Sequence, residues 1–535
     1  MTLNTDAVIG TGAIVNAARD VVVAANASDQ VTAVAAAAAG GAVGVAGVVS
    51  VIVLSTHTYA DTGPGVAITA GNNALLTAAD ATKITVVSGG VAVGAVGVGI
   101  GVAVTSLTKD TRAFIGAGSA VDALAKQPGV ALAGIDDGTV SSSGFGTLPA
   151  FNGLAVQARS SENVFGMAVA AGGGFVGVAG GIDIGIADIT SQAYIGSFAT
   201  LHAAKDVAFY ALAIKKIQTY AVSIGGGFVG VAGSVSVWSV GTAPTGSYNE
   251  GSYGQDKGAW SSTATYAQGD VVTGSDGKRY GAKVANPTLD PVADTTGSQW
   301  EGATDALTPS SSKPDAATEA GGHANGSGTG GYTGILDGTS NLHNTSGNTN
   351  GRMQPTLGSA NTSVHGSAPS STIVSAQFSN ASVPQGTVAT VGAGTVIVTG
   401  GSVSVAAGEN LAVNGLAGTA AGGAVAVGGS VLILGITSNV EAFIQTGASV
   451  TAGGDVNVKT ALTENDNGLA FAGVGGAVAV TGQVVVITSH ATQNAHIDDG
   501  AVIPTAGGTV DVEALATRTV SPLAIGGSIG LVAAG

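Results

Sequence analysis

The nine residues GGGFVGVAG occur twice in the chain, at Gly172–Gly180 and at Gly225–Gly233, and this repetition decides the fold. The two copies begin 53 residues apart. A second phrase, Ala followed by an aromatic residue and then by Ile, recurs with the same 53-residue spacing at Ala442 and Ala495. Self-similarity at a fixed period indicates stacked units, none of which can bury its apolar faces alone. We therefore expect a repeat protein built from coils of about 53 residues.

The spacing is irregular in one place. Copies of the second phrase start at Ala113 and Ala193, an interval clearly longer than one period and shorter than two. The surplus coincides with an irregular stretch around Gly134–Phe151, which we interpret as an inserted loop and call the smaller insertion.

Met1 is not followed by the basic start and apolar run of a signal peptide. We therefore expect export by another signal, or a segment of a longer protein.

Each Gly-rich stretch alternates between two kinds of residue. In one copy, Val96, Val98 and Ile100 alternate with Gly97 and Gly99. A period of two is typical of a β-strand, whose successive side chains point to opposite faces. We expect the branched face to lie in the interior of the coil. The Gly/Ala/Ser face is expected to pack against another sheet layer, within the coil or on a neighbouring protomer. A wide coil that encloses both faces fits the pattern equally well.

One stretch has the length of a membrane-spanning helix. Ala35–Ser55 contains 21 residues and no charge, and about 18 suffice to cross a bilayer. Gly and β-branched residues at this density disfavour a helix, and Asp183 and Asp188 interrupt another copy of the stretch. We therefore predict that the chain does not span a membrane.

The composition narrows the class of protein. Hydrophobic residues make up 45 % of the chain, with 88 Gly, but charged residues only 9 %, against about 25 % in ordinary soluble domains. The net charge of −16 argues against nucleic acid as a partner, because nucleic-acid binding needs a basic surface. The absence of Cys excludes disulfides, thiolate metal sites and thiol nucleophiles.

The repeats are interrupted once more. We assign residues 1–242 and 373–535 to the repeats, 243–302 to an inserted module, and 303–372 to a polar low-complexity linker rich in Gly, Ser, Thr and Asn. Residues of about 257–302 resemble the chitin-binding-type carbohydrate-binding modules, which are short three-stranded β folds. The matching residues are Ala259-Trp260, Tyr266, Gly269-Asp270, Val272, Gly277, Tyr280, Ala282, Pro291 and Trp300.

This resemblance implies that Trp260, Tyr266, Tyr280 and Trp300 contact a polysaccharide. Sugar-binding members usually carry an exposed Trp shortly after the Tyr-x-Ala phrase, where this chain has Lys283-Val284. The alternative is that the four aromatic residues form the small core of the module.

Candidate catalytic and metal-binding motifs are sparse. Asp61-Thr62-Gly63 matches the aspartic-protease phrase, but that chemistry needs two such loops. Asp136-Asp137-Gly138 and Asp498-Asp499-Gly500 are typical of turns. His490, His496 and Asp498 are the only local histidine–carboxylate grouping. We predict no catalytic residue, no metal site and no cofactor, and therefore no enzyme.

On both sides of the inserted module, the repeat phrase T-x-A-(F/Y)-I-G … V-x-V-x-A … G-G-x-x-G-V-x-G-S-V-x-V resembles that of giant filamentous-haemagglutinin-like adhesins, including leukotoxin-family filamentous adhesins. The resemblance implies an all-β, right-handed parallel β-solenoid, export to the bacterial cell surface, and a role in adhesion or matrix building. We expect a structural subunit of an extracellular fibre that associates with itself. The alternative is a surface adhesin that binds polysaccharide through the inserted module.

Overall fold

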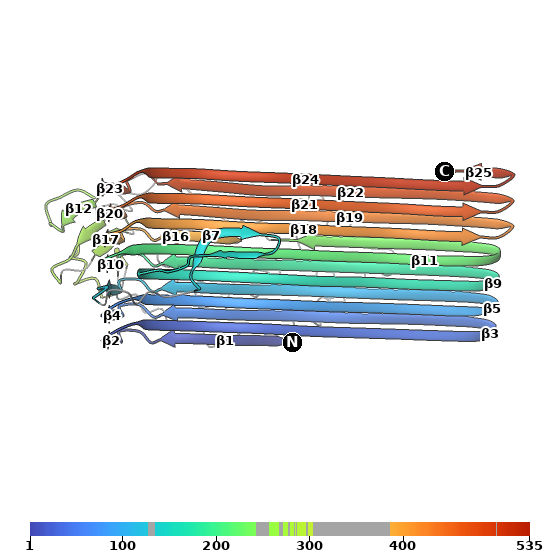
Figure 1. The fold of residues 1–535 in the computed structure, drawn as a ribbon, viewed down its shortest axis with the longest axis horizontal. Helices are drawn as coiled ribbons and strands as arrows, with labels where there is room; N and C mark the ends of the chain where they lie inside the picture. The colour runs from blue at the N-terminus through green and yellow to red at the C-terminus, as the bar shows by residue number, and fades with distance from the viewer. Residues whose placement is uncertain are drawn as a thin grey trace.

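The computed structural model describes residues 1–126, 134–241, 256–266, 271–276, 279–282, 284, 286–295, 298–302, 386–498 and 500–535. These residues form β-strands and turns and no helix, as the sequence predicts. Residues 303–372, together with Gly269-Asp270, Gly277, Lys283 and Asp499, lie outside the described residues. Figure 1 shows long strands stacked side by side, with short strands at one end.

Each long strand runs out from the short strands, reverses and runs back. β3 (Val21–Thr62) and β5 (Ala74–Ile115) each contain both directions, which we call the outgoing half and the return half. The reversal at the far end is a sharp one: Gly41 and Gly174 have φ values of 147° and 146°, a region that glycine adopts without strain. β9 (Gly153–Ile195) and β11 (Asp206–Val240) reverse in the same way.

Later coils divide these halves into separate strands. The outgoing halves are β18 (Val403–Gly422), β21 (Val456–Gly475) and β24 (Val510–Ile529), and the return halves are β19 (Val425–Ile444), β22 (Val478–Ile497) and β25 (Val532–Ala534). β1 (Thr2–Ile9) and β16 (Thr387–Val391) are further return segments. All of these strands belong to one 12-stranded sheet with parallel pairing.

The pairing register follows the predicted repeat. Val21 pairs with Ala74, and Val403 with Val456, in both cases exactly one period further along the chain. Ala74 pairs with Leu154 although the smaller insertion lies between them, so that insertion leaves the register of the flanking coils intact. Equivalent residues therefore form continuous ladders along the stack.

A second, 7-stranded parallel sheet closes the wide end. Its strands are β2 (Ile14–Ala17), β4 (Ala67–Ala70), β6 (Ala120–Ala123), β10 (Thr200–Ala203), β17 (Val396–Thr399), β20 (Ser449–Ala452) and β23 (Val502–Ala506). Their inward side chains, such as Ile68, Val121 and Leu201, are fully buried against those of the long strands. This is the largest apolar core of the described residues.

A polar layer separates this core from a second one. Asp80, Lys109 and Glu162 are fully buried inside the coils, where the Lys109 Nζ lies 2.8 Å from the Asp80 Oδ1 and 2.9 Å from the Glu162 Oε1. Beyond this layer, Ile84 and Leu107 belong to a second buried apolar cluster. Toward the reversal, the inward residues become Ser, Ala and Gly.

The two halves come very close near the reversal, and the face that lies inside is the small-residue one. A Cβ on Gly97 would lie 2.8 Å from the Ala92 carbonyl oxygen of the same coil, and one on Gly99 would lie 2.8 Å from that of Gly90. Between them, Val98 points outward, and Ile100 is 39 % exposed. The expectation that the branched face lies inside is therefore wrong in this region. The expectation that the small-residue face packs against another sheet layer within the coil is confirmed.

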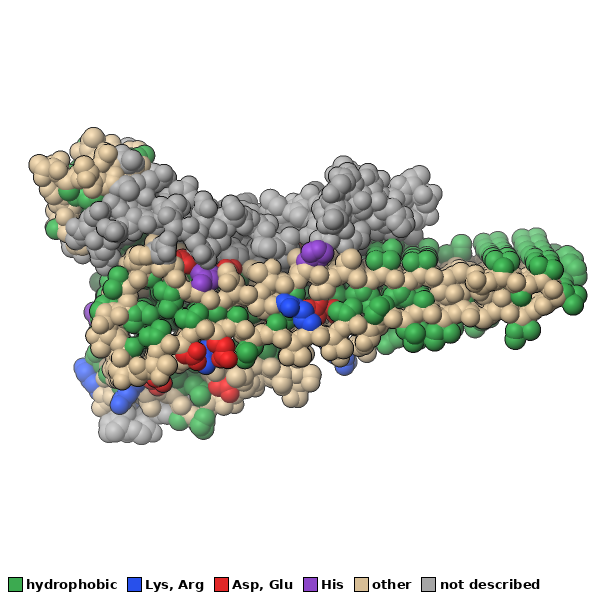
Figure 2. All heavy atoms as spheres, turned by 90° about the horizontal axis from the view of Figure 1, so that it is seen from above, with side chains coloured by type: hydrophobic (Ala, Val, Ile, Leu, Met, Phe, Trp, Pro, Cys, Tyr) green, Lys and Arg blue, Asp and Glu red, His purple; other side chains and the backbone are tan. Residues whose placement is uncertain are grey.

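We call this narrow region the thin arm. It comprises residues 33–51, 86–104, 166–184, 219–237, 415–433, 468–486 and 522–535. Figure 2 shows it tapering away from the wide end, with hydrophobic side chains along its surface.

A matched pair of glycine substitutions tests this assignment of faces. Gly177→Val places a Cβ within 2.2 Å of the Gly226 carbonyl oxygen and 2.6 Å of that of Gly172, so we expect a loss of about 3 kcal/mol or more in unfolding free energy from overpacking. Gly180→Val, in the same coil, meets no atom within 4 Å and should be close to neutral. Chemical denaturation followed by far-UV circular dichroism measures both. Equal effects of the two substitutions would contradict the assignment.

The smaller insertion forms a hairpin that lies on the outer face of the outgoing halves. Its strands are β7 (Asp136–Ser141) and β8 (Gly144–Thr147). Ile135 and Phe151 flank the hairpin and pack against Tyr210 of β11. The predicted inserted loop is thus confirmed, and it covers part of one sheet face.

The larger insertion interrupts a single return half. β11 ends at Val240, which pairs with Ala187, and β16 resumes with Thr387, which pairs with Ser191. The Gly241 N–H donates to the Ala187 carbonyl, and the Gly386 carbonyl accepts from the Ser191 N–H. By register, residues 242–385 replace one residue of the coil, the equivalent of Ile189.

Candidate functional surfaces

The inserted module contains the four aromatic residues predicted to contact carbohydrate. Its strands are β12 (Asp256–Ala259), β13 (Val271–Thr273), β14 (Arg279–Ala282) and β15 (Trp300–Gly302), which form a four-stranded sheet rather than the three-stranded fold that the resemblance implies. Tyr266, Tyr280 and Trp300 are 3 %, 4 % and 2 % exposed. Trp260 is half-buried against them.

Specific contacts hold these rings in place. Tyr266 and Trp300 meet edge to face, with centroids 5.7 Å apart. The Trp300 Nε1–H donates to the Leu289 carbonyl (2.7 Å), and the Tyr280 hydroxyl donates to the Asp276 Oδ2 (2.8 Å). Burial, followed by the hydrogen bond to Asp276, raises the pKa of the Tyr280 phenol. The arrangement is that of a small core, the alternative role considered for these residues; sugar binding by the module stays a prediction.

The histidine–carboxylate grouping is only partly assembled. His496 Nδ1 lies 2.7 Å from the Asp498 Oδ1, its Nε2 lies 3.1 Å from the Glu441 Oε1, and its ring stacks on Phe443 at 4.8 Å. His490 is exposed and takes no part in these contacts. Among the described residues, no His, Asp and Glu side chains converge as a metal site.

The aspartate motifs lie apart from one another. Asp61 is the penultimate residue of β3, where burial and then the neighbouring Asp6 raise its pKa to about 7. Asp136 lies in the hairpin of the smaller insertion, 3.4 Å from Arg159, and burial raises its pKa to about 6. Neither is paired with a second carboxylate in the manner of an aspartic-protease dyad.

The feature that sequence analysis missed is the outer surface of the thin arm. The seven segments that form the arm contain a single charged residue, Asp183, which is buried. On the return face, a ladder of seven valines is formed by Val43, Val96, Val176, Val229, Val425, Val478 and Val532. Val43 and Val532, in the first and last coils, are 67 % and 64 % exposed, and Val425 and Val478 are each 38 % exposed. Large exposed apolar surfaces mark sites of association.

Apolar side chains also line the opposite, outgoing face. Phe175 and Phe228 project at the reversal, 62 % and 55 % exposed, and stack with centroids 5.0 Å apart. Ile224 is 53 % exposed. Both broad faces of the thin arm are thus apolar, and Figure 2 shows the hydrophobic side chains gathered on both sides of it.

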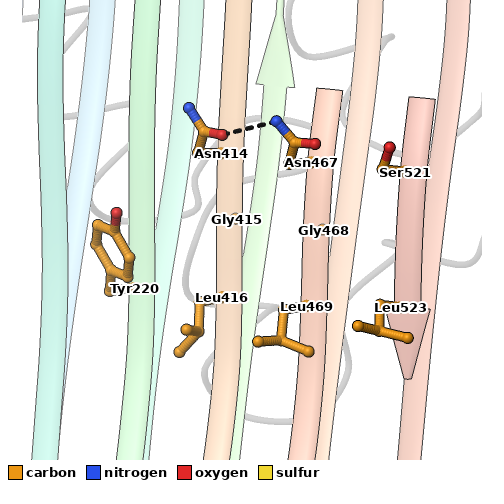
Figure 3. Close-up of a pocket in the computed structure, with 9 residues that line it drawn as sticks. All are labelled: Tyr220, Asn414, Gly415, Leu416, Asn467, Gly468, Leu469, Ser521 and Leu523. Atoms are coloured by element: carbon orange, nitrogen blue, oxygen red, sulfur yellow. Dashed lines mark hydrogen bonds between the residues drawn. The ribbon is translucent and has the colours of Figure 1, made fainter. Parts of the chain in front are cut away.

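A shallow depression lies where the outgoing face meets the thicker part of the coils. One wall is the ladder Tyr220, Leu416, Leu469 and Leu523, and the other is Asn414, Asn467 and Ser521, as Figure 3 shows. The Asn467 side-chain amide donates to the Asn414 Oδ1 (3.0 Å). These polar side chains hydrogen-bond to one another from coil to coil, so we interpret the depression as part of the packing of the stack rather than as a binding site.

A signal for the exposed valines was present in the sequence. Residues at equal distances on either side of the reversal lie opposite each other, as Ala92 and Gly97 do. Where both members of such a pair are Gly or Ala, the sheets approach too closely for branched side chains to lie between them. Valine must then point outward.

The described residues contain no helix of the length and apolarity needed to cross a membrane, and Ala35–Ser55 lies in β3. Comparisons of the chain with protein-family models, with curated proteins and with solved structures gave no match.

Proposed function

We propose that this chain is a structural segment of an extracellular fibre on a bacterial surface, built as a right-handed parallel β-solenoid that associates with copies of itself. The observation that carries the proposal is the thin arm. Its coils stack in register, its interior holds mostly Gly, Ala and Ser near the reversal, and its outer faces are apolar and without charge. In a monomer these apolar surfaces stay exposed to water, whereas an assembly buries them.

The composition supports an assembly rather than an enzyme. Most of the buried charged residues lie in ion pairs or hydrogen bonds inside the coils, as Lys109 and Lys215 do. The predicted site residues do not converge into an acid–base or nucleophilic constellation.

Negative-stain electron microscopy of the purified chain tests the proposal. We expect regular filaments or laterally ordered bundles; uniform single particles at all concentrations would refute it.

An adhesin that binds polysaccharide through the module is the second candidate. The observation that favours it is the position of the larger insertion, which replaces one residue of one coil and leaves the register on either side intact. Such an insertion adds a module without changing how the neighbouring coils pair.

A deletion separates the two candidates. Residues 242–385 are replaced by a single Ile, the residue that the register assigns to this position by analogy with Ile189. Co-sedimentation with insoluble chitin and electron microscopy are then compared with the full chain. Loss of chitin binding with filaments intact would favour the adhesin, whereas absence of chitin binding in both proteins would exclude chitin as its ligand.

A further inference from the structure

We propose that two copies of this chain pack face to face through the return faces of their thin arms. This inference rests on the proposed self-association and names the surface that performs it. The occupant of the surface is a second copy of the same chain, because the return face is complementary in shape to itself.

The return face consists of ridges and one groove. Beside the ladder of seven valines runs a second ridge, formed by Val45, Val98, Val178, Val231, Val427 and Val480. The next outward position is a groove of glycines, interrupted once by Ile100, at Gly47, Gly180, Gly233, Gly429 and Gly482. Beyond the groove, a third ridge is exposed only at its two ends, at Val49 (57 %) and Val484 (48 %); between them Val102 is buried, and Ile182, Val235 and Val431 are partly buried in the same apolar cluster.

The groove is open space. At Gly180, Gly233 and Gly482, an added Cβ would meet no atom within 4 Å. A valine ridge of one copy can therefore enter the glycine groove of the other. A twofold axis that lies in the plane of the interface, parallel to the ladders, makes this contact twice, which is the requirement for a closed, isologous interface.

The extent of the face is sufficient for a stable contact. Six strands at ~4.8 Å spacing, with about seven residues at ~3.3 Å each, together with the three residues of β25, span roughly 700 Å². Stable interfaces bury about 600–1,000 Å² on each partner. The face contains no charged residue, so its burial desolvates no ion. The outgoing face is less regular: it has an apolar ladder of Tyr220, Leu416, Leu469 and Leu523 beside the depression, but nearer the reversal one of its outward ladders runs through Ile224, Ala420 and Gly473 and forms no ridge.

Charge substitutions at the centre of the face test the proposal. Val231→Lys/Val427→Lys, in neighbouring coils of the second ridge, places two like charges on each copy at the contact. We expect self-association measured by sedimentation velocity to weaken by about 100-fold or more. Val231→Asp/Val427→Asp should weaken it equally. A 1:1 mixture of the two variants should associate again, because opposite charges then meet across the same face.

The matched control lies on the opposite face of the same two coils. Ile224→Lys/Ala420→Lys adds the same charge at exposed positions and should leave association unchanged. Far-UV circular dichroism and thermal melting verify that all variants remain folded. If the Lys variant associates as the wild type does, or if the mixture fails to associate, the face-to-face contact is refuted.

These outcomes are distinct from those for the proposed fibre. Filaments that persist in the Lys variant would refute the face-to-face contact and leave the fibre standing. A wild-type chain that forms dimers lost in the Lys variant and restored in the mixture, but no filaments, would support the contact and refute the fibre. A wild type that stays monomeric at tens of micromolar or higher would refute the contact.

Discussion

Replacement of Lys109 by Met is expected to lower the free energy of unfolding by about 3–5 kcal/mol. The Lys109 side chain is completely buried, and so are those of its two carboxylate partners. Its Nζ forms ion pairs with Asp80 and Glu162 and also donates to the Asp80 carbonyl (3.0 Å) and to the Thr82 hydroxyl (3.1 Å).

Most of this loss in stability comes from the two buried carboxylates that Lys109→Met leaves without a cation. Met fills a volume similar to that of Lys but carries no charge, so two carboxylates stay inside the coils without a cation. Burial already raises the pKa of Glu162, and Lys109 opposes that effect. Without the ammonium group, the carboxylates must be protonated or remain charged and unpaired, and both states are costly in the folded protein.

Two further variants make this expectation specific. Lys83→Met removes an exposed ammonium group from the same strand and should cost less than about 1 kcal/mol. Lys109→Met combined with Asp80→Asn and Glu162→Gln removes all three charges and should recover most of the lost stability. Urea denaturation measures all three. A single Lys109→Met variant as stable as Lys83→Met would show that the ion pairs are not needed.

The same layer also fixes which coil lies next to which. Glu162 pairs in register with Lys215, whose Nζ lies 2.8 Å from the Glu409 Oε2 in the following coil. The Thr387 and Ser438 hydroxyls donate to the same Glu409 carboxylate. Coils as similar as these could otherwise pair in more than one order. Buried charges that find their partners in only one order impose a unique stack.

The coil length could be predicted from the sequence, because stacking in register requires each residue to resemble its equivalent one period away. The two copies of GGGFVGVAG, at Gly172 and Gly225, state the period directly, and the two strand segments pair at that offset. Both interruptions of the period were also recognisable, because insertions between coils leave the flanking ladders unchanged.

The orientation of the strands could not be deduced from alternation alone. A period of two separates Val98 from Gly99 but is equally compatible with either residue inside. The structure settles the choice through the thickness of the arm, since Gly99 faces Gly90 across the coil. That thickness depends on which residues lie opposite each other after the reversal at Gly94, and a strand pattern by itself contains no such information.

The buried ion pairs could not be predicted from the sequence, for a related reason. Lys109 lies in the return half of β5, whereas Asp80 lies in the outgoing half of the same strand and Glu162 in the outgoing half of β9. The composition shows that charged residues are few, whereas the fold collects several of them in one layer. In the module, Tyr266 and Trp300 could be selected as important, but sequence did not decide between a sugar contact and a core role.

The protein is expected to lose stability between pH 4 and pH 7, and Asp183 accounts for a large part of the loss. Its side chain lies in the interior of the arm, where the Trp238 Nε1–H donates to the Oδ2 (3.0 Å) and the Thr219 hydroxyl donates to the same atom. Burial raises the pKa of Asp183 from 3.8 to about 7, and these hydrogen bonds only partly oppose the shift.

The direction of the pH effect follows from which state retains the proton. Below pH 3.8, Asp183 is protonated in the folded and unfolded states alike and has no effect on stability. Between 3.8 and about 7, the unfolded chain has lost the proton and the folded chain keeps it, so stability falls as the pH rises. The full difference corresponds to ~4 kcal/mol and is reached above pH 7.

Asp183→Asn removes this titration and retains an acceptor oxygen for the Trp238 indole. The difference in unfolding free energy between the variant and the wild type should therefore rise by ~4 kcal/mol from pH 4 to pH 7 and then level off. Other buried acids, such as Asp466 with a pKa of about 9, titrate in both proteins and cancel in this difference. Ser236→Ala alters the same hydrogen-bonded cluster without removing an ionisable group, and should preserve the wild-type slope. If the unfolding free energies of Asp183→Asn and the wild type change in parallel with pH, the prediction is wrong. The interior of the arm would then stabilise the charged Asp183 carboxylate, through water or another partner.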